Sequence, residues 1–381
     1  MITIIEKNKC CGCTACASIC TQNAITMKPD ALGFLYPEVN KSKCTDCGLC
    51  EKVCSFHDNY DKSFNLSQPE AYAARHKNMQ EVETSRSGAA FIAISDYILE
   101  KGGVVYGAGY TDYFRVIHKR AVNKEERNEF KGSKYVQSDL TGIFHQIKED
   151  LKNKKIVLFS GTPCQTSGLK SYVSKKLQNN LFLVDIVCHG VPAPYIWRDY
   201  LAYITNTYGQ NIVKVNFRDK RIGWKDHKES FELSDGRLLL KRDYTHLYYQ
   251  HIMLRESCSV CPFCNITRPS DITIADFWGW EKTDTQINAD NKGVSLLFCN
   301  TEKGRELFKL INKELIYIPA ILENCMQGHL RYPTAMHPNR IKFENDYVIN
   351  GFMYVMKRYG DMERLNSFKK FCKTIIHKII K

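Results

Sequence analysis

Cysteines carry most of the chemistry that this chain could perform. Of its 17 cysteines, nine lie within the first 54 residues, and eight of these form two copies of the spacing Cys-x2-Cys-x2-Cys-x3-Cys. The first copy is Cys10, Cys13, Cys16 and Cys20, and the second is Cys44, Cys47, Cys50 and Cys54. Thiolates spaced in this way can wrap a tight loop around three corners of an iron–sulfur cubane. The sequence therefore predicts an iron–sulfur module at its amino-terminal end.

The same run is typical of bacterial two-cluster ferredoxins, in which the fourth cysteine of each run ligates the cluster of the other run. We therefore expect two [4Fe-4S] clusters with crossed ligation. The first would be held by Cys10, Cys13, Cys16 and Cys54, and the second by Cys44, Cys47, Cys50 and Cys20. Gly12 and Gly48 would supply backbone freedom where the chain passes close to inorganic sulfide. Cys11 is expected to take no part in ligation.

A disulfide framework is the alternative interpretation of these cysteines. The apolar run at the start of the chain is far too short for a signal peptide, and the longest apolar runs elsewhere have the length of strands. We therefore expect a cytoplasmic protein, in which clustered thiols bind metal. Exposed clusters would favour an anaerobic or low-oxygen setting.

The chain is basic, with 54 Lys and Arg against 41 Asp and Glu and a formal net charge of +13. A basic surface suits an acidic redox partner such as ferredoxin, or the phosphates of a nucleotide cofactor. No helix-turn-helix, RNP or zinc-finger pattern is present, so no nucleic-acid partner is expected. No Ser/His/Asp or paired-carboxylate constellation stands out, which disfavours hydrolysis.

Composition and hydrophobic periodicity divide the chain into a series of regions. Residues 1–57 form the cluster module, 58–68 a polar linker, 69–150 and 151–325 the two parts of a large domain, and 326–381 a basic helical extension. Helical and strand patterns alternate in the large domain. We therefore expect an α+β / α/β multidomain fold, with a ferredoxin-like module followed by a mixed-sheet α/β domain.

Individual elements of the large domain follow from periodicity. Helices are expected around 91–98, 140–151 and 196–204. Strands are expected at 104–110, 156–159, 181–187, 272–275 and 296–299, with further strands between 211 and 240.

Two of these strands run into cysteine, at Cys164 and Cys188. Ligands bind at the carboxyl ends of strands in open α/β sheets. Further along the chain, Cys258, Cys261 and Cys264 form a compact group. Three interpretations remain open from the residues alone: an activated thiol at Cys164, a buried core cysteine at Cys188, and a small zinc site within the compact group.

Several motifs carry a resemblance to a known family. They are Ser85-Arg86-Ser87-Gly88-Ala89, Gly132-Ser133-Lys134-Tyr135, Gly161-Thr162-Pro163-Cys164-Gln165, Cys188-His189-Gly190, Phe217-Arg218-Asp219-Lys220-Arg221 with Gly223-Trp224, and the stretch from Asp271 to Gly279. With the ferredoxin-like module, they resemble the beta-subunit family of coenzyme F420 hydrogenases and dehydrogenases in its bacterial branch, to which plant 7-hydroxymethyl chlorophyll a reductase is related. The resemblance implies FAD and a third four-iron cluster, held by Cys164, Cys188, Cys258 and Cys261, with Cys264 as a substitute for Cys261.

No dinucleotide fingerprint marks a FAD site, because Gly107-x-Gly109 lacks the third glycine and the helix that should follow it. A phosphate cradle is expected instead at Thr84, Ser85, Arg86, Ser87 and Gly88, just before a helix. An ordinary helix N-cap is the competing interpretation. Further candidates for contacts with flavin or a substrate anion are Ser133, Lys134, Tyr135, Arg218, Lys220 and Arg221, which could equally be solvated surface.

Residues 368–381 alternate apolar and basic side chains at near-helical spacing. They could lie on the anionic inner face of a membrane as a peripheral contact. The alternative is a basic terminal helix that packs on the protein.

These observations favour an iron–sulfur flavoprotein oxidoreductase. It would pass electrons between a low-potential carrier such as ferredoxin, its [4Fe-4S] clusters, FAD and a second, small-molecule redox substrate. The alternatives are a non-catalytic electron-relay subunit of a larger redox complex, with a link to polysaccharide biosynthesis, and a redox-sensing or scaffold protein. A deazaflavin substrate is implied for archaeal relatives, but no residue here demands it. Cluster potentials vary widely, so the sequence does not set the direction of electron flow.

Overall fold

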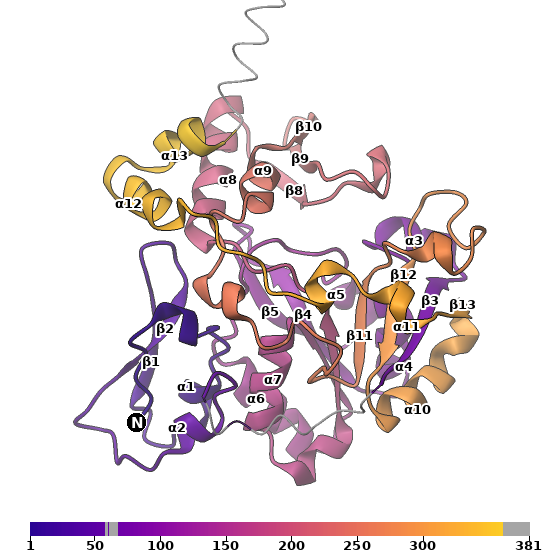
Figure 1. Cartoon of the computed structure of the whole chain (residues 1–381), viewed down its shortest axis with the longest axis horizontal. Coiled ribbons are helices and arrows are strands. Elements are labelled where there is room, and N and C mark those ends of the chain that lie inside the picture. Colours follow the sequence, from indigo (N-terminus) through magenta and orange to yellow (C-terminus); the bar gives the residue numbers. More distant parts are fainter. Residues whose placement is uncertain (58–59, 61–67, 361–381) are drawn as a thin grey trace, which may run out of the picture.

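The structure is a computed structural model that describes residues 1–57, 60 and 68–360. An amino-terminal module, a central sheet with its covering helices, and a cap of three strands and four helices lie against one another (Figure 1). Most of the expected linker at 58–68 and all of residues 368–381 lie outside the described residues, so the predicted membrane contact of 368–381 stays a prediction.

The amino-terminal module has a short hairpin between its two cysteine runs. Strands β1 (Ile25–Pro29) and β2 (Leu35–Val39) pair antiparallel, and helices α1 (Ala15–Ile19) and α2 (Leu49–Lys52) each follow the start of a cysteine run. Gly12 and Gly48 have φ angles of +70° and +72°, in the left-handed region that favours glycine. The backbone turns that a cluster loop requires are therefore present at the two predicted positions.

The large domain is built on an eight-stranded sheet with the order β13-β3-β12-β11-β7-β6-β4-β5. Its strands are β3 (Glu70–His76), β4 (Val104–Tyr110), β5 (Val116–Ala121), β6 (Val157–Gly161), β7 (Leu181–Ile186), β11 (Ile272–Asp276), β12 (Ser295–Cys299) and β13 (Leu315–Pro319). The four central strands β11, β7, β6 and β4 are parallel, and all the outer pairings are antiparallel. The mixed sheet is as predicted, and the carboxyl ends of its central strands meet at one edge.

Alternating side chains along the central strands pack against different layers of helices. On β6, Val157 and Phe159 belong to the hydrophobic core beneath α6 (Ile143–Lys152) and α7 (Pro163–Tyr172). Leu158, between them, faces the core beneath α4 (Ala90–Glu100) and α10 (Glu302–Ile311). Because both faces are covered, the central strands are continuous apolar runs in the sequence.

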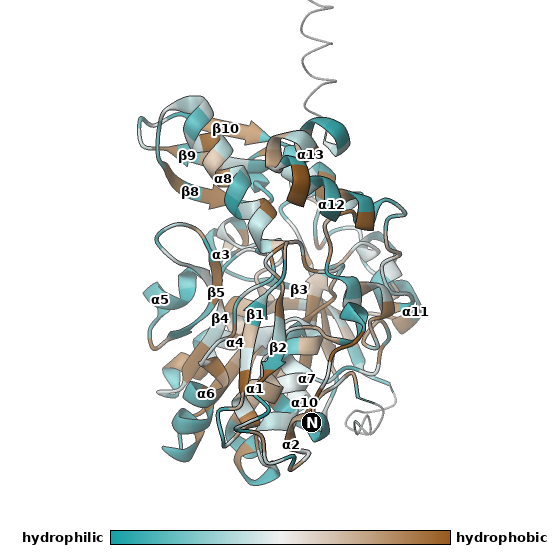
Figure 2. Ribbon diagram, turned by 90° about the vertical axis from the view of Figure 1, so that its left-hand side faces the viewer, coloured by the Kyte–Doolittle hydropathy of each residue, from teal (hydrophilic) through white to brown (hydrophobic). Residues whose placement is uncertain are grey.

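The remaining elements cap one end of the sheet or connect its strands. The cap contains β8 (Ile212–Asn216), β9 (Glu229–Leu233), β10 (Leu238–Lys241), α8 (Pro194–Tyr208), α9 (Asp243–Tyr249), α12 (Arg340–Asn350) and α13 (Phe352–Tyr359). Short connecting helices are α3 (Met79–Thr84), α5 (Lys124–Asn128) and α11 (Leu322–Cys325). Figure 2 shows the cap as the upper part of the molecule, where an aromatic core around Trp197, Tyr200 and Phe231 holds it together. No described helix meets the length and apolarity that crossing a bilayer demands.

Helix α7 is the surface on which the amino-terminal module docks. Helix α1 packs directly against α7, and Cys11, Cys13 and Ala15 share a hydrophobic core with Leu169 and Tyr172. Gly168, in the interior of α7, makes this close approach achievable because a Cβ there would lie 2.7 Å from Cys13 Sγ and 3.0 Å from Cys13 Cβ. The module is therefore fitted tightly to the large domain.

Alanine at position 168 tests this packing. Ala normally stabilises a helix interior relative to Gly, but here its methyl group would overlap Cys13. We expect Gly168→Ala to lower the free energy of unfolding by about 1–3 kcal/mol in denaturant titrations. Gly328→Ala is the control, because its added Cβ meets no atom within 4 Å, and its effect should stay within about 0.5 kcal/mol. Equal stability of the two variants would contradict the close contact of α7 with Cys13.

Candidate functional site

Four cysteines of the module surround one small cavity. Cys20, Cys44, Cys47 and Cys50 all line it, which is the set expected for the second cluster. Backbone N–H groups point at three of these sulfurs, with Ala24 N 3.3 Å from Cys20 Sγ, Ile2 N 3.3 Å from Cys50 Sγ and Asp46 N 3.4 Å from Cys44 Sγ. Such donors stabilise a thiolate and raise the reduction potential of a cluster that it holds. The donor set fits a four-iron cluster.

Three of the other four predicted cysteines, Cys10, Cys16 and Cys54, also gather, and Cys13 lies against α7 of the large domain. Burial and then the neighbouring Cys10, Cys54 and Cys50 thiols raise the pKa of Cys16. Burial, with Cys10 and Cys50 nearby, also raises the pKa of Cys54. Thiols brought this close without a metal are costly to ionise, and bound iron reverses that cost. This arrangement fits the crossed ligation that the spacing predicts.

A third group of cysteines forms where two central strands end. Cys164 follows β6 in the first turn of α7, and Cys188 follows β7. Cys258 lies on the short 3-10 helix η4 (Glu256–Val260), and Val191 N points at its sulfur from 3.4 Å. Burial first, and then Cys258, Cys164 and Cys264, raise the pKa of Cys188. The structure therefore brings together cysteines that lie almost 100 positions apart in the sequence.

Cys261 and Cys264 are in contact with each other within this third group. Their hydrogen bond raises the pKa of Cys261 and lowers that of Cys264. Among the described residues, no three His, Cys, Asp or Glu side chains are arranged to hold a single metal ion. A zinc site at Cys258, Cys261 and Cys264 therefore gains no support, whereas a cubane needs its thiolates spread around a larger group.

The third group adjoins the amino-terminal module directly. The Cys11 thiol contacts both Cys13 of the module and Cys164 of α7. This contact, followed by burial, raises the pKa of Cys164 well above its usual value. An activated nucleophile at a helix N-terminus would show a lowered pKa, so the structure does not favour that interpretation of Cys164. Cys11, expected to be a bystander, lies between the two sites.

Iron content tests which cysteines hold the third cluster. If the predicted ligands are correct, the anaerobically reconstituted wild-type protein should bind about twelve irons per chain. The iron content of Cys261→Ser should fall toward about eight. Cys264→Ser should keep the full complement, as should Cys325→Ser, a buried cysteine outside all three groups. If only Cys264→Ser loses iron, the ligand is Cys264 and not Cys261. If both Cys261→Ser and Cys188→Ser keep the full iron content, the third cluster site does not exist.

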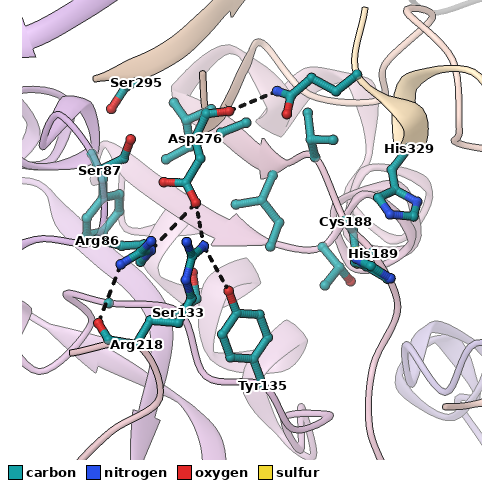
Figure 3. A pocket seen from close by; sticks show the side chains of 18 of the residues that line it. Arg86, Ser87, Ser133, Tyr135, Cys188, His189, Arg218, Asp276, Ser295 and His329 are labelled. Carbon is teal, nitrogen blue, oxygen red and sulfur yellow. Dashed lines mark hydrogen bonds and ion pairs between the residues drawn. The ribbon is translucent and has the colours of Figure 1, made fainter. Parts of the chain in front are cut away.

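A cavity of about 870 Å³ opens at the carboxyl ends of the central strands. Residues at or just after the ends of β6, β7 and β11 line it, including Thr162, Cys188 and Asp276, and so does the start of α4. Figure 3 shows Cys188 and His189 on one wall and Arg86, Arg218 and Asp276 on the opposite wall. The cavity therefore reaches from the third cysteine group to a cluster of charges, at the edge where parallel sheets bind ligands.

The charged wall is built from one carboxylate between two guanidinium groups. Asp276 Oδ2 lies 2.7 Å from Arg218 Nη1 and 3.5 Å from Arg86 Nε (Figure 3). Burial alone would raise the pKa of Asp276, but the two arginines hold it below its usual value. Arg86 also donates to Trp224 O at 2.6 Å, and Arg218 Nη1 lies 3.5 Å from the Tyr135 hydroxyl. One positive charge remains in excess, so this wall favours an anionic ligand group.

The candidate flavin-contact residues divide into two sets. Seven line the cavity: Ser85, Arg86, Ser87, Ser133, Lys134, Tyr135 and Arg218. The other four, Thr84, Gly88, Lys220 and Arg221, do not line it. Lys220 Nζ donates to the backbone at Val82 O and Ser87 O, and Arg221 pairs with Asp219. Lys134 lines the cavity, but its ammonium group donates to three carbonyls of the preceding turn, at Glu129, Lys131 and Gly132.

The loop before α4 has features of an anion cradle. The helix begins after Ala89, which has a left-handed φ of +63°, and no side chain caps it, so the ordinary hydroxyl N-cap is absent here. Ser85 Oγ is buried, lines the cavity and has no hydrogen-bond partner in the described part of the chain. An unpartnered buried hydroxyl beside a guanidinium and a helix start fits a ligand phosphate. The residues present could therefore hold FAD.

Aromatic and imidazole groups complete the cavity, and no sequence pattern pointed to most of them. Trp278 is 43% exposed and stacks on buried Trp224 with ring centroids 4.7 Å apart. His189 Nε2 lies 2.6 Å from His251 Nε2, and its ring is 4.0 Å from that of His329. His189 is thus a hydrogen-bonding residue. His329 follows no strand motif and lines the cavity, whereas His251 contacts His189 without lining the cavity, and only the folding of distant segments brings these rings together.

His118 is a buried imidazole at the base of the cavity. Its Nε2 lies 3.0 Å from Ser160 O and its Nδ1 2.8 Å from Ser138 Oγ. The carbonyl can only accept, so Nε2 carries the hydrogen and Nδ1 accepts from the serine hydroxyl. Burial lowers the pKa of His118 from 6.5 to about 4. The ring is therefore neutral at physiological pH.

This lowered pKa predicts acid sensitivity. The unfolded chain takes up the His118 proton near pH 6.5 and the folded chain only near pH 4. The stabilisation is therefore complete above pH 6.5 and falls with decreasing pH, by about 2 kcal/mol at pH 5. His118→Gln keeps a donor and an acceptor but no titrating group. Between pH 7 and pH 5, it should lose about 2 kcal/mol less unfolding free energy than wild type in denaturant titrations. Identical losses would show that His118 does not titrate.

Comparison with known proteins gives two family matches and one similar solved structure. Residues 154–321 match the family that describes the C terminus of the beta subunit in coenzyme F420 hydrogenase/dehydrogenase, and residues 9–57 match the 4Fe-4S dicluster domain. The chain is similar to one in the structure of the xenon-derivatised F420-reducing [NiFe] hydrogenase complex from Methanosarcina barkeri. That likeness has 16% sequence identity, covers 76% of this chain and 90% of the other, and has a TM-score of 0.48. No curated protein matches the chain.

Proposed function

We propose that this chain, which belongs to the coenzyme F420 hydrogenase/dehydrogenase beta-subunit family, is an iron–sulfur flavoprotein oxidoreductase. It would pass electrons between a low-potential carrier such as ferredoxin, three [4Fe-4S] clusters, FAD and a second redox substrate. Iron–sulfur electron transfer follows from the family and from the dicluster domain. The third cluster, the flavin and the partner are proposed beyond that.

The placement of the third cysteine group carries this proposal. Cys164 contacts the module through Cys11, and Cys188, in the same group, lines the large cavity. A cluster at this position would lie between the amino-terminal clusters and a ligand in the cavity. Electrons would then have a continuous route through closely packed groups, from the module to the ligand.

The side chains of the cavity would bind and orient its ligand. The surplus positive charge of Arg86 and Arg218 over Asp276 would attract a phosphate, and Ser85 Oγ would donate to it. FAD, when bound, supplies the exchange between one-electron clusters and two-electron substrates. Trp278 and Tyr249, which also line the cavity, would exclude water from one side of the ligand.

The outer end of the module suits a protein partner. Cys47 is exposed at the second cysteine site, and Lys41 and Lys43 are exposed in the loop that precedes it, as is Lys52 on α2. Basic side chains near an accessible cluster favour docking of an acidic carrier such as ferredoxin, and this attraction weakens at high ionic strength. Electrons would enter or leave the chain at this end.

A relay subunit without flavin is the second candidate, and flavin content separates the two. Anaerobically purified protein should release FAD on denaturation, and flavin-depleted protein should bind added FAD. If neither preparation contains flavin, the relay function is correct and the proposed flavoprotein function is wrong.

Substitutions of arginine test whether the cavity is the flavin site. Arg86→Gln removes a guanidinium from the charged wall, and we expect it to weaken FAD binding at least about tenfold, because charged hydrogen bonds contribute about 1.5–3 kcal/mol. Arg221→Gln lies outside the cavity and should bind FAD as wild type does. Fluorescence titration of flavin-depleted protein measures both, with iron content as the check on folding. Equal affinity of the two variants would place the flavin elsewhere.

A further inference from the structure

Arg255 is a buried cation that lies between the first cysteine run, which contains Cys10, and the third cysteine group, which contains Cys258. It is fully buried and precedes Cys258 by three positions. Its own backbone is tied to the third group, because Arg255 N donates to Val191 O at 3.0 Å and Cys258 N donates to Arg255 O at 3.0 Å. Its side chain reaches into the amino-terminal module.

The guanidinium makes a set of short contacts with the first cysteine run. Nε donates to Cys10 O at 2.7 Å, and Nη2 donates to Leu35 O at 2.9 Å and lies 3.6 Å from Cys10 Sγ. Nη1 donates to Gln137 Oε1 at 2.8 Å, and Gln137 in turn donates to Cys11 O at 2.8 Å. A side chain at Gly12 would lie 2.9 Å from Nη1, so glycine there keeps space for the guanidinium.

This positive charge has no carboxylate partner in the part of the chain that the structure describes. Within the described ranges, no ion pair joins Arg255 to an Asp or Glu, its titratable neighbours are Cys10, Cys11, Cys258 and Tyr36, and the group stacks on the Tyr36 ring at 4.2 Å. Burying an uncompensated charge is strongly unfavourable, so a buried guanidinium points to an anion nearby. The anions that the neighbouring residues would provide are the thiolate-bound clusters, each with a net negative charge in its oxidised form.

We infer that Arg255 is the positioning residue that couples the first and third clusters. It holds the loop of residues 10–13 so that Cys11 packs against Cys164, and its charge and its hydrogen bond to Cys10 Sγ raise the reduction potential of the first cluster. Hydrogen bonds to cluster sulfurs raise potentials because they stabilise the more negative reduced state. This inference rests on the proposed function, since it assumes that the clusters bind.

Redox titration followed by electron paramagnetic resonance tests this role in the full-length, anaerobically reconstituted chain. Arg255→Gln should lower the reduction potential of the first cluster, the one that includes Cys10. The reduction potential of the second cluster, at Cys20, Cys44, Cys47 and Cys50, should stay unchanged. Arg255→Lys keeps the charge but not the fork of donors, so its shift should have the same sign and be smaller. Arg127→Gln removes another buried arginine, which binds Ile92 O and Asp96, and should shift no potential.

The outcomes separate this inference from the proposed function. Wild-type protein without reducible clusters would defeat the proposed function itself. Wild-type potentials in an iron-replete Arg255→Gln protein would overturn only the role of Arg255. If Arg255→Gln does not retain iron, the potentials of Arg255→Lys decide the question, and their identity with wild type would overturn the inference.

Discussion

The structure depends on the contact between the first cysteine run and helix α7. The proposed electron route requires the first cysteine run and the third cysteine group to lie close together, and the chain packs Cys13 against Gly168 and Cys11 against Cys164. Without that fit, the amino-terminal module and the cavity would not be joined by closely packed groups. Gly168 therefore keeps α7 open to the close approach of Cys13.

Positive charge is found at several points between the outer end of the amino-terminal module and the far wall of the cavity. The module presents lysines near its exposed cysteine site, Arg255 lies between the first and third groups, and Arg86 and Arg218 form the far wall of the cavity. Each of these cations faces a group that is expected to be anionic. The formal charge of +13 omits the clusters, so part of this surplus compensates negative charge that the protein would acquire with its cofactors.

Local sequence patterns predicted the parts of the fold that depend on local physics. The cysteine spacing identified the four residues around the outer cavity, and apolar runs located the central strands almost residue for residue, as at β4 (Val104–Tyr110). Strand β3 escaped prediction because its sequence, with three alanines among charged residues, lacks a period of two. β5 and β13 are the edge strands of the sheet; β5 has a weak apolar signal, whereas the apolar run of β13 was not among the predicted strands.

The site was less accessible to sequence reasoning, because it depends on long-range contacts. Lys220 and Arg221 belong to a charged run that includes Arg218, yet only Arg218 reaches the cavity, and the other two bind backbone carbonyls and Asp219. Cys11 lacked any spacing signal, and its place between two cysteine groups follows from the docking of α1 on α7. Arg255 looked like an ordinary basic residue, and its burial became visible only in three dimensions.

If the proposed function is correct, three cluster sites form one continuous line from the outer module to the cavity. Electron paramagnetic resonance of the fully reduced, reconstituted chain is the decisive experiment, because unpaired spins on neighbouring clusters broaden and split each other's signals. We expect three reducible centres, with such magnetic interaction both within the module and between the module and the third centre. Two centres alone, or a third whose signal is independent of the others, would show that no such line exists.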